Sequence, residues 1–272
     1  MYFLRHLSLD KRSLFSLFLA FNSKMAAADT GDRTWGNSAW NLAATEVYGR
    51  PSSSLTDFVE LSESDLNNET YKAGYHASHC MIYALNNDRI FATYKARANI
   101  LMQLRFDGYI GFPGGLVDKG ESPLEALNRE LQEEINLNPK YQVKPSDLIC
   151  THWSQSKKII LHFYALEVAK DDVIEIEKTA LTSHDYGVEV LGTVRVPLYT
   201  MGDGFRGFPC FLTHSFIGNA RTQLITALQK LNIMSVEEVN AALNARPVPV
   251  KVFVPPSTTS SNTSSTVDSA KS

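Results

Sequence analysis

The chain has 272 residues, 44% of them hydrophobic, and a formal net charge of -3. This length can supply a sizeable buried core, and the near-neutral charge argues against binding nucleic acid through an overall basic surface. The three cysteines, Cys80, Cys150 and Cys210, are far apart in sequence and form no CxxC pair. They therefore argue against a disulfide scaffold and indicate a reducing compartment.

The first 28 residues have three interpretations. They include a short apolar run, Leu14 to Phe21, which is too short to span a bilayer. The run can be the core of a secretory signal, with the small residues Ala26 to Ala28 as a cleavage zone. It can also belong to a transit peptide, because Asp10 is the only acidic residue before Asp29. Alternatively, Met25 is the main initiator and the preceding residues are an upstream extension.

Polar segments flank the predicted domain on both sides. Residues 29–71 are polar, contain the break GRPSSS, and are expected to form a poorly ordered, loop-like extension. Residues 251–272 are rich in Ser and Thr with little to bury, which predicts a disordered tail. The folded domain is therefore expected over residues 72–250.

Hydrophobic patterning inside this domain predicts both strands and helices. Strands are expected at 76–85, 99–106, 159–168 and 188–199, and helices at 122–135, 219–231 and 235–245. Mixed elements in this order predict the α+β class.

The helix at 122–135 has clear start and stop signals. Ser122 can cap its N-terminus, Pro123 suits the first helical position, and Glu125 stands three residues after the cap. Asn136 is expected to end the helix, because asparagine tolerates the left-handed conformation common just past a helix C-terminus.

Acidic residues line the edge of this helix's apolar stripe. The stripe consists of Leu124, Leu127, Leu131 and Ile135. At about 100° per residue, Glu130 and Glu134 flank it, and Glu133 lies one step further round. Arg129 stands four residues from both Glu125 and Glu133 and can pair with either. Carboxylates crowded beside a buried stripe repel one another, and a divalent cation would relieve that repulsion.

A glycine-rich loop precedes the helix. GFPGG contains Gly111, Gly114 and Gly115, which allow a sharp turn and a close approach of the backbone to a ligand. Taken separately, the loop can be an ordinary glycine turn and the helix an ordinary solvated face held by Arg129. Taken together, they favour a cation site built from carboxylate and backbone oxygens.

The segment from Gly115 to Leu137 reads G-x5-E-x7-R-E-L-x-E-E-x-N-L. It resembles the Nudix box, G-x5-E-x7-R-E-U-x-E-E-x-G-U, in which U is an aliphatic residue. Only Asn136 departs from the pattern, at a position where asparagine is the usual second choice. Further similarity, from about residue 74 to 232, is to the branch of the family that decaps small nucleolar RNA and hydrolyses inosine diphosphate.

The resemblance implies an α/β/α sandwich with a mixed sheet flanked by helices, and a metal-dependent pyrophosphohydrolase that uses two or more Mg²⁺ or Mn²⁺ ions. It implies RNA caps and inosine or deoxyinosine diphosphate as substrates. The implied metal ligands are Gly114, Glu130, Glu133, Glu134 and Glu189. The implied catalytic residues are Glu133, Glu134 and Arg129. The implied substrate-binding residues are His79, Arg105, Phe112 and Gln223.

Each substrate-binding candidate also has a structural interpretation. His79 and Phe112 can be core residues, Arg105 can pair with Asp107, and Gln223 can be a surface residue. Glu189 can likewise be an edge-strand charge.

The resemblance further implies a homodimer, no membrane association, and a location in the nucleus (nucleolus and nucleoplasm) and cytoplasm. Translation from Met1 would add mitochondrial targeting as an alternative. Two other functions stay open: a non-catalytic, syndesmos-like scaffold that binds RNA or protein, and a hydrolase of ADP-ribose or NAD-type caps. Intact box glutamates argue against the scaffold, because such crowded acids are an unneeded cost there.

Overall fold

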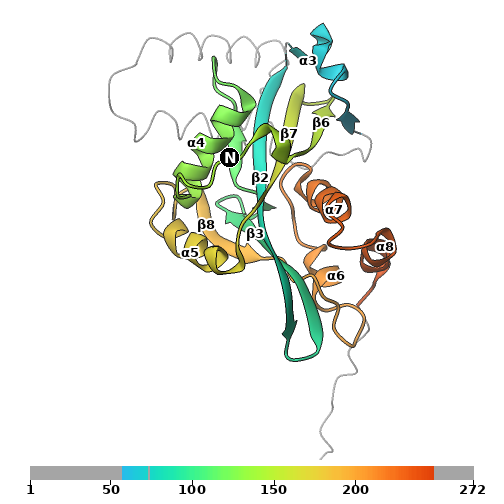
Figure 1. Ribbon diagram of the computed structural model, residues 1–272. Coiled ribbons are helices and arrows are strands. Elements are labelled where there is room, and N and C mark those ends of the chain that lie inside the picture. The colour runs from blue at the N-terminus through green and yellow to red at the C-terminus, as the bar shows by residue number, and fades with distance from the viewer. Residues whose placement is uncertain (1–56, 73, 248–272) are drawn as a thin grey trace, which may run out of the picture.

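The computed structural model describes residues 57–72 and 74–247 (Figure 1). The candidate targeting segment at 1–28 and the Ser/Thr-rich tail at 251–272 lie outside the described residues. The three cysteines, Cys80, Cys150 and Cys210, are free thiols. No helix in the described ranges combines the length and apolar content needed to cross a bilayer.

The strands are β1 (Phe58–Leu61), β2 (Tyr75–Ile90), β3 (Tyr94–Arg105), β4 (Ile110–Gly111), β5 (Gly114–Leu116), β6 (Leu148–Ser154), β7 (Ile159–Glu167) and β8 (Val190–Arg195). The helices are α3 (Glu69–Lys72), α4 (Pro123–Ile135), α5 (Lys170–Ala180), α6 (Phe208–Phe211), α7 (Ala220–Lys230) and α8 (Val236–Asn244). Short 3-10 turns lie at Asp65–Asn67 and Pro145–Asp147. All seven predicted elements are present, with bounds that differ by a few residues.

The strands form one mixed sheet in the order β1-β6-β7-β2-β3-β4, with β5 also paired to β2 and β8 to β3. The β2–β7 pair is parallel and the other pairs are antiparallel. Figure 1 shows α4 and α5 on one side of this sheet and α6, α7 and α8 on the other. The predicted α/β/α sandwich is confirmed.

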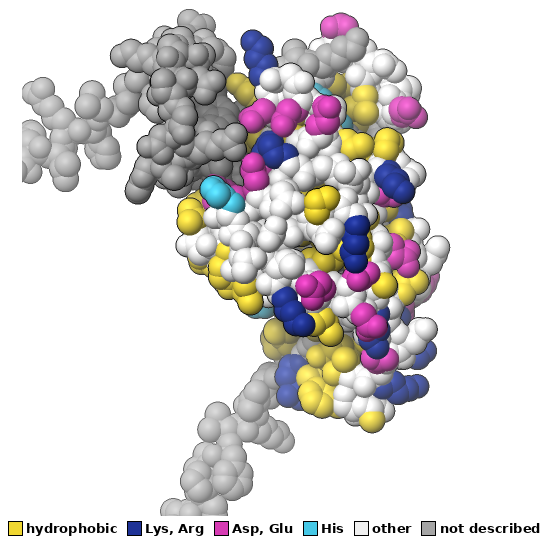
Figure 2. Space-filling model, turned by 60° about the vertical axis from the view of Figure 1, so that its left-hand side comes forward, with side chains coloured by type: hydrophobic (Ala, Val, Ile, Leu, Met, Phe, Trp, Pro, Cys, Tyr) yellow, Lys and Arg dark blue, Asp and Glu magenta, His cyan; other side chains and the backbone are white. Residues whose placement is uncertain are grey.

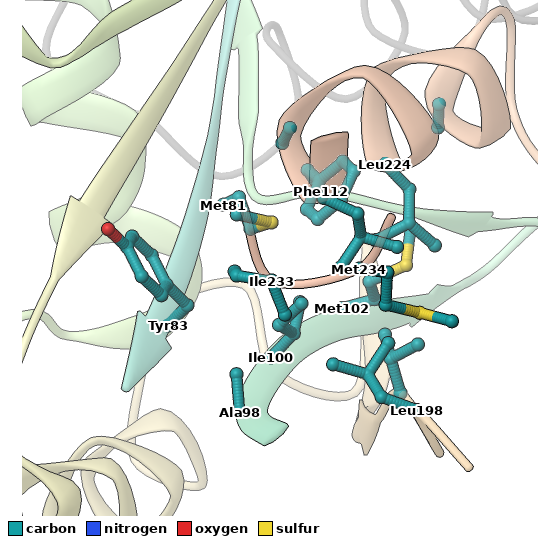
Figure 3. Packing of buried hydrophobic residues seen from close by; sticks show 14 of the residues in the cluster. Met81, Tyr83, Ala98, Ile100, Met102, Phe112, Leu198, Leu224, Ile233 and Met234 are labelled. Atoms are coloured by element: carbon teal, nitrogen blue, oxygen red, sulfur yellow. The ribbon is translucent and has the colours of Figure 1, made fainter. Parts of the chain in front are cut away.

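Alternation along β2 explains why both faces of the sheet are covered. Cys80 and Ile82 pack into a core shared with α4 and α5. Met81 and Tyr83 point the other way, into a second core shared with α6, α7 and α8 (Figure 3). Because β2 contributes to both cores, it is the central strand against which the site is built.

Several elements were not expected from the sequence, and three of them are informative. Strand β1 falls inside the segment expected to be loop-like, and it is ordered by antiparallel pairing with β6. Strand β6 was not predicted, because its second half mixes polar and apolar residues although all of them, from Cys150 to Ser154, are buried. Helix α5 was not predicted either. It buries Val173, Ile176 and Ala180, and their helical spacing is visible in the sequence.

Candidate active site

Helix α4 begins and ends as its sequence predicts. The Ser122 side chain accepts a hydrogen bond from the Glu125 N–H at 3.3 Å, and the Glu125 carboxylate accepts one from the Ser122 N–H at 2.8 Å. Asn136 adopts the left-handed conformation with φ 49° and ψ 44°, and its N–H donates to the Gln132 carbonyl. The departure from the Nudix box is therefore accommodated without losing the helix stop.

Arg129 holds the acidic residues of α4 and the preceding loop together. Its guanidinium donates to Glu121 from Nε at 3.0 Å, to Glu130 at 2.9 Å and to Glu133 at 3.2 Å. These bonds, to Glu121 above all, raise the pKa of Arg129. The predicted pairing with Glu133 is confirmed, whereas Glu125 belongs to the helix cap. The planar fork thus orients three carboxylates at once.

Glu134 is buried beneath this network. Its side chain is 3% exposed, and its Oε2 accepts a hydrogen bond from the Gly114 N–H at 2.9 Å. Burial raises the pKa of Glu134 well above its usual range, and the neighbouring Glu130 raises it further. The Gly114 N–H and the charge of Arg105 act in the opposite direction. A cation placed here would favour the ionised carboxylate.

Glu130 completes a group of mutually repelling carboxylates. Burial raises its pKa to about 7, against the opposing effect of Arg129. Glu133 and Glu189 add further repulsion, and Glu189 acts on Glu134 as well. Glu189 therefore lies within electrostatic reach of both glutamates, although it precedes β8 and is far from them in sequence. Figure 2 turns the left-hand side of Figure 1 forward and shows acidic side chains gathered in its upper part beside basic ones.

The two glycines that end the GFPGG loop are required by close packing. Gly114 has a φ of +131°, and a Cβ there would fall 2.1 Å from the Ser78 carbonyl oxygen. At Gly115 a Cβ would fall 2.6 Å from the Glu130 carboxylate. The loop backbone therefore lies directly against the acidic helix, as the sequence interpretation requires.

The donor set suits a hard divalent cation. Carboxylates from Glu130, Glu133, Glu134 and Glu189, with the Gly114 carbonyl, are the oxygen ligands that Mg²⁺ and Mn²⁺ prefer. Within residues 57–72 and 74–247, no three His, Cys, Asp or Glu side chains stand ready to hold a metal ion as they are placed. Burial, with repulsion between the carboxylates added to it, raises the pKa values of Glu130 and Glu134, and a cation bound there would relieve both effects.

Two of the predicted substrate contacts lie beside the acidic group. His79 pairs with Gly114 in the β2–β5 register, and its Nδ1 is buried without a hydrogen-bond partner among the described residues. Burial, and to a smaller extent the charge of Arg105, lowers the pKa of His79 to about 4. Arg105 forms an ion pair with Asp107 at 3.3 Å, as its structural interpretation anticipates. Its charge still acts on both His79 and Glu134.

The other two predicted substrate contacts are buried. Phe112 is 3% exposed and packs against Phe163 with ring centroids 4.8 Å apart (Figure 3). Its ring is part of the core, as its structural interpretation anticipates, and its contact with substrate stays a prediction. Gln223 is 2% exposed rather than a surface residue, and its Nε2 has no partner within the described residues.

Sequence reasoning assigned no role to two residues that anchor the end of α4. The Ser183 hydroxyl donates to the Glu134 carbonyl at 2.7 Å, and the Asp185 N–H donates to the Glu133 carbonyl at 3.2 Å. These bonds tie the segment leading to Glu189 onto helix α4. No motif marks them, because the contact joins residues about fifty positions apart.

Comparison with known proteins agrees with this geometry. The family model described as "Nudt16-like: U8 snoRNA-decapping enzyme-like" matches residues 76–234. A U8 snoRNA-decapping enzyme of Homalodisca vitripennis is 58% identical over 188 residues, covering 69% of this chain and 98% of that protein. The human Tudor-interacting repair regulator protein is 40% identical over 172 residues, covering 62% and 80%. A MutT/Nudix structure from Listeria innocua aligns with a TM-score of 0.39 and 17% identity, covering 59% of this chain and 94% of that one.

The family model spans more than half of the chain, and the most similar of these relatives is matched over nearly its full length. Both the box and the elements that position it lie inside the matched region. The chain therefore belongs to the Nudt16-like family and is a Nudix hydrolase.

Proposed function

We propose that this hydrolase is a Mg²⁺- or Mn²⁺-dependent pyrophosphohydrolase that cleaves RNA 5′ caps and converts inosine or deoxyinosine diphosphate to the monophosphate. The observation that carries the proposal is the gathering of Glu130, Glu133, Glu134 and Glu189 around the GFPGG loop, with Arg129 as their bridge. The name of the Homalodisca relative supports RNA caps as the substrate class.

Each acidic residue has its own task in this proposal. Two or more divalent ions held by Glu130, Glu134, Glu189 and the Gly114 carbonyl would supply positive charge to a diphosphate and make water more acidic. The side chain of Glu133 is 44% exposed, which suits a base that receives a proton from water at the site entrance. Arg129 keeps Glu133 and Glu130 in fixed orientations. The charge of Arg105 suits a contact with phosphate.

The test compares hydrolysis of capped RNA and of inosine diphosphate by the wild type and by Glu134→Gln, with Mg²⁺ or Mn²⁺. We expect the variant to lose at least about 100-fold in kcat, because it removes a charge that binds cation. Glu175→Gln removes an exposed glutamate on α5 and serves as the matched control. Calorimetric titration with Mn²⁺ should show binding by the wild type and by Glu175→Gln, and weakened binding by Glu134→Gln. Equal activity and equal Mn²⁺ binding in all three proteins would refute the metal assignment.

A non-catalytic scaffold that binds RNA or protein is the second candidate. It is favoured by the similarity to the human Tudor-interacting repair regulator protein. The complete set of box acids and their shared Arg129 favours the hydrolase instead, since a scaffold gains nothing from buried, repelling carboxylates. A substrate panel ranked by kcat/KM and including ADP-ribose and NAD-capped RNA separates the remaining hydrolase alternatives.

The proposal includes a homodimer and residence in the nucleus and cytoplasm. Light scattering on the purified protein measures its mass in solution. Mass spectrometry of the native N-terminus distinguishes a start at Met1 from one at Met25, and with it the mitochondrial alternative.

A further inference from the structure

The end of α4 is capped by a segment from elsewhere in the chain. The carbonyls of a helix's last turn have no partners inside the helix and must find them outside it. In α4, the Glu133 carbonyl accepts a hydrogen bond from the Asp185 N–H at 3.2 Å. The Glu134 carbonyl accepts one from the Ser183 hydroxyl at 2.7 Å. The two carbonyls capped in this way belong to the paired glutamates of the Nudix box.

The capping segment also presents Glu189. The Asp185 carbonyl accepts hydrogen bonds of 3.0–3.2 Å from three successive N–H groups, and the second of these belongs to Glu189. The Glu189 carbonyl accepts from the Phe106 N–H at 3.0 Å. The backbone of Glu189 is therefore held at both its N–H and its carbonyl. One hydrogen-bonded turn joins the cap of α4 to the carboxylate that completes the acidic group.

Asn136 adds a contact that the glycine of the Nudix box cannot make. Its Nδ2 donates to the Thr182 hydroxyl oxygen at 3.3 Å, and its Oδ1 accepts from the Gln132 amide at 2.7 Å. The one departure from the box thus provides a second link between α4 and the capping segment. This outer link is exposed, whereas Ser183 is only 9% exposed. The Ser183 bond is therefore expected to be the stronger of the two links, because water competes less with a buried bond.

These links fix the relative position of carboxylates from two separate parts of the chain. Glu134 is carried by α4, and Glu189 by the segment that precedes β8. The charge of Glu189 acts on both Glu130 and Glu134. A hard divalent ion such as Mg²⁺ demands near-ideal placement of its oxygen ligands. A shift of α4 against the capping segment would therefore separate ligands of the same cation site.

We propose that Ser183 is a positioning residue for the cation site, and that Asn136 assists it through Thr182. By holding the Glu134 carbonyl, Ser183 keeps the end of α4 in register with Glu189, so that both carboxylates can hold a cation together. The hydroxyl acts through the main chain of α4 and touches neither cation nor substrate. Hydrogen-bond partners behind metal ligands typically change metal affinity or activity by about 10–100-fold when they are removed.

This inference rests on the proposed function for its cation, so its test measures Mn²⁺ binding by calorimetric titration of the full-length protein. Ser183→Ala should weaken Mn²⁺ binding about tenfold. Ser154→Ala is the matched control, because the Ser154 hydroxyl is also buried and also donates at 2.7 Å, but to Asp57 from β6. The control should lower the unfolding midpoint, as Ser183→Ala does, and leave Mn²⁺ binding unchanged.

Asn136→Gly restores the consensus of the box and tests the outer link. Glycine adopts the left-handed conformation easily, so the helix stop should remain and the unfolding midpoint should change little. Mn²⁺ binding should weaken about threefold, the value of a weak exposed hydrogen bond. An Mn²⁺ affinity equal to that of the wild type would remove Asn136 from the proposal.

A double-mutant cycle with Glu189→Gln separates positioning from a general loss of structure. If Ser183 acts by holding α4 in register with Glu189, Ser183→Ala should add little to the loss of Mn²⁺ affinity that Glu189→Gln causes alone. A further loss of about tenfold in the double variant would overturn the inference, because the two effects would then be independent. Equal weakening of Mn²⁺ binding by Ser183→Ala and Ser154→Ala would overturn it as well.

Hydrolysis of inosine diphosphate and capped RNA with Mn²⁺ separates this inference from the proposed function. Mn²⁺ binding that depends on Ser183, without hydrolysis of either substrate, would refute the proposed function and support the positioning role. Hydrolysis together with an Mn²⁺ affinity that Ser183→Ala leaves unchanged would keep the function and overturn the positioning role. A wild type that binds no Mn²⁺ would overturn both.

Discussion

Gly115 and Glu130 are packed so closely that a methyl group on the glycine would fall 2.6 Å from the glutamate's carboxylate. The backbone of the GFPGG loop and the Glu130 side chain of α4 thus pack directly against each other. The contact is with the far end of a flexible side chain, so an added methyl group would displace Glu130 rather than prevent folding.

Gly115→Ala should therefore lower hydrolysis by about 100-fold, since a displacement of about 1 Å in a catalytic site has that effect. Gly202→Ala is the control, because a Cβ at Gly202 meets no atom within 4 Å. The measurements are kcat with Mn²⁺ and the unfolding midpoint of both variants. Full activity of Gly115→Ala would show that the position of Glu130 does not matter for the reaction.

Arg129 should not be replaceable by lysine. Lysine cannot reproduce the fork that reaches Glu121, Glu130 and Glu133 together. We expect Arg129→Lys to lose about 1 kcal/mol of unfolding free energy and at least about tenfold in kcat. Arg195→Lys changes an exposed ion pair with Glu177. It should lower the unfolding free energy by at most about 0.5 kcal/mol and leave kcat unchanged. Urea unfolding and steady-state kinetics of both variants provide the comparison.

His162 should make the fold sensitive to acid. Its ring nitrogen Nε2 lies 2.9 Å from His76 Nδ1, and burial, followed by the charge of His76, lowers the pKa of His162 to about 4. The unfolded state, with a pKa near 6.5, then binds more protons between these values. This contribution to stability is complete above about pH 6.5 and is lost as the pH falls toward 4.

Between pH 7.5 and 5.0 the expected loss from this residue is about 2 kcal/mol. His162→Gln should reduce that pH dependence, even if its stability at pH 7.5 is lower. His214→Gln, at an exposed histidine, is the control. Urea unfolding at both pH values measures the unfolding free energy. If His162→Gln lost as much unfolding free energy between pH 7.5 and 5.0 as the wild type, His162 would not be the source of the acid sensitivity.

The tip of the β2–β3 hairpin should be stabilised by glycine. Phe91 and Ala92 both have positive φ, 52° and 54°, and the Thr93 N–H donates to the Ile90 carbonyl at 3.0 Å. This is a turn with two left-handed central residues, where glycine costs less than alanine. Ala92→Gly should therefore raise the unfolding free energy by about 1 kcal/mol.

The same change inside a helix should have the opposite sign. Ala241 is exposed within α8, so Ala241→Gly should lower the unfolding free energy by about 1 kcal/mol. Chemical denaturation of the two variants beside the wild type tests both signs at once. Destabilisation by Ala92→Gly would mean that the turn owes its conformation to contacts of the alanine side chain.

Local signals in the sequence determine the bounds of the acidic helix α4. Ser122, Glu125 and Asn136 act on their own neighbours along the chain, so the start and the stop of α4 can be predicted without the rest of the fold. The apolar stripe and the flanking acids follow from the 3.6-residue repeat. The Nudix box adds the family, because its spacing joins the loop and the helix into one recognisable segment.

Tertiary structure decided the features that depend on distant partners. Strand β1 pairs with β6, and hydrogen bonds from Ser183 and Asp185 hold the segment that leads to Glu189 on the end of α4. The burial of Phe112 is decided in the same way. An aromatic ring beside a glycine loop can face a ligand or a core, and the packing of Phe163 selected the core.

The same distinction holds for the side-chain amides of Asn219 and Gln223 at the start of α7. Their spacing of four residues is visible in the sequence, but nothing local shows that both NH₂ groups are buried and without partners. Burial is a property of the layers that close over a side chain, and these layers come from segments more than a hundred residues apart. The sequence by itself therefore determined the family and the acidic helix, and only the packing of α7 on the sheet determined that these two amides are buried.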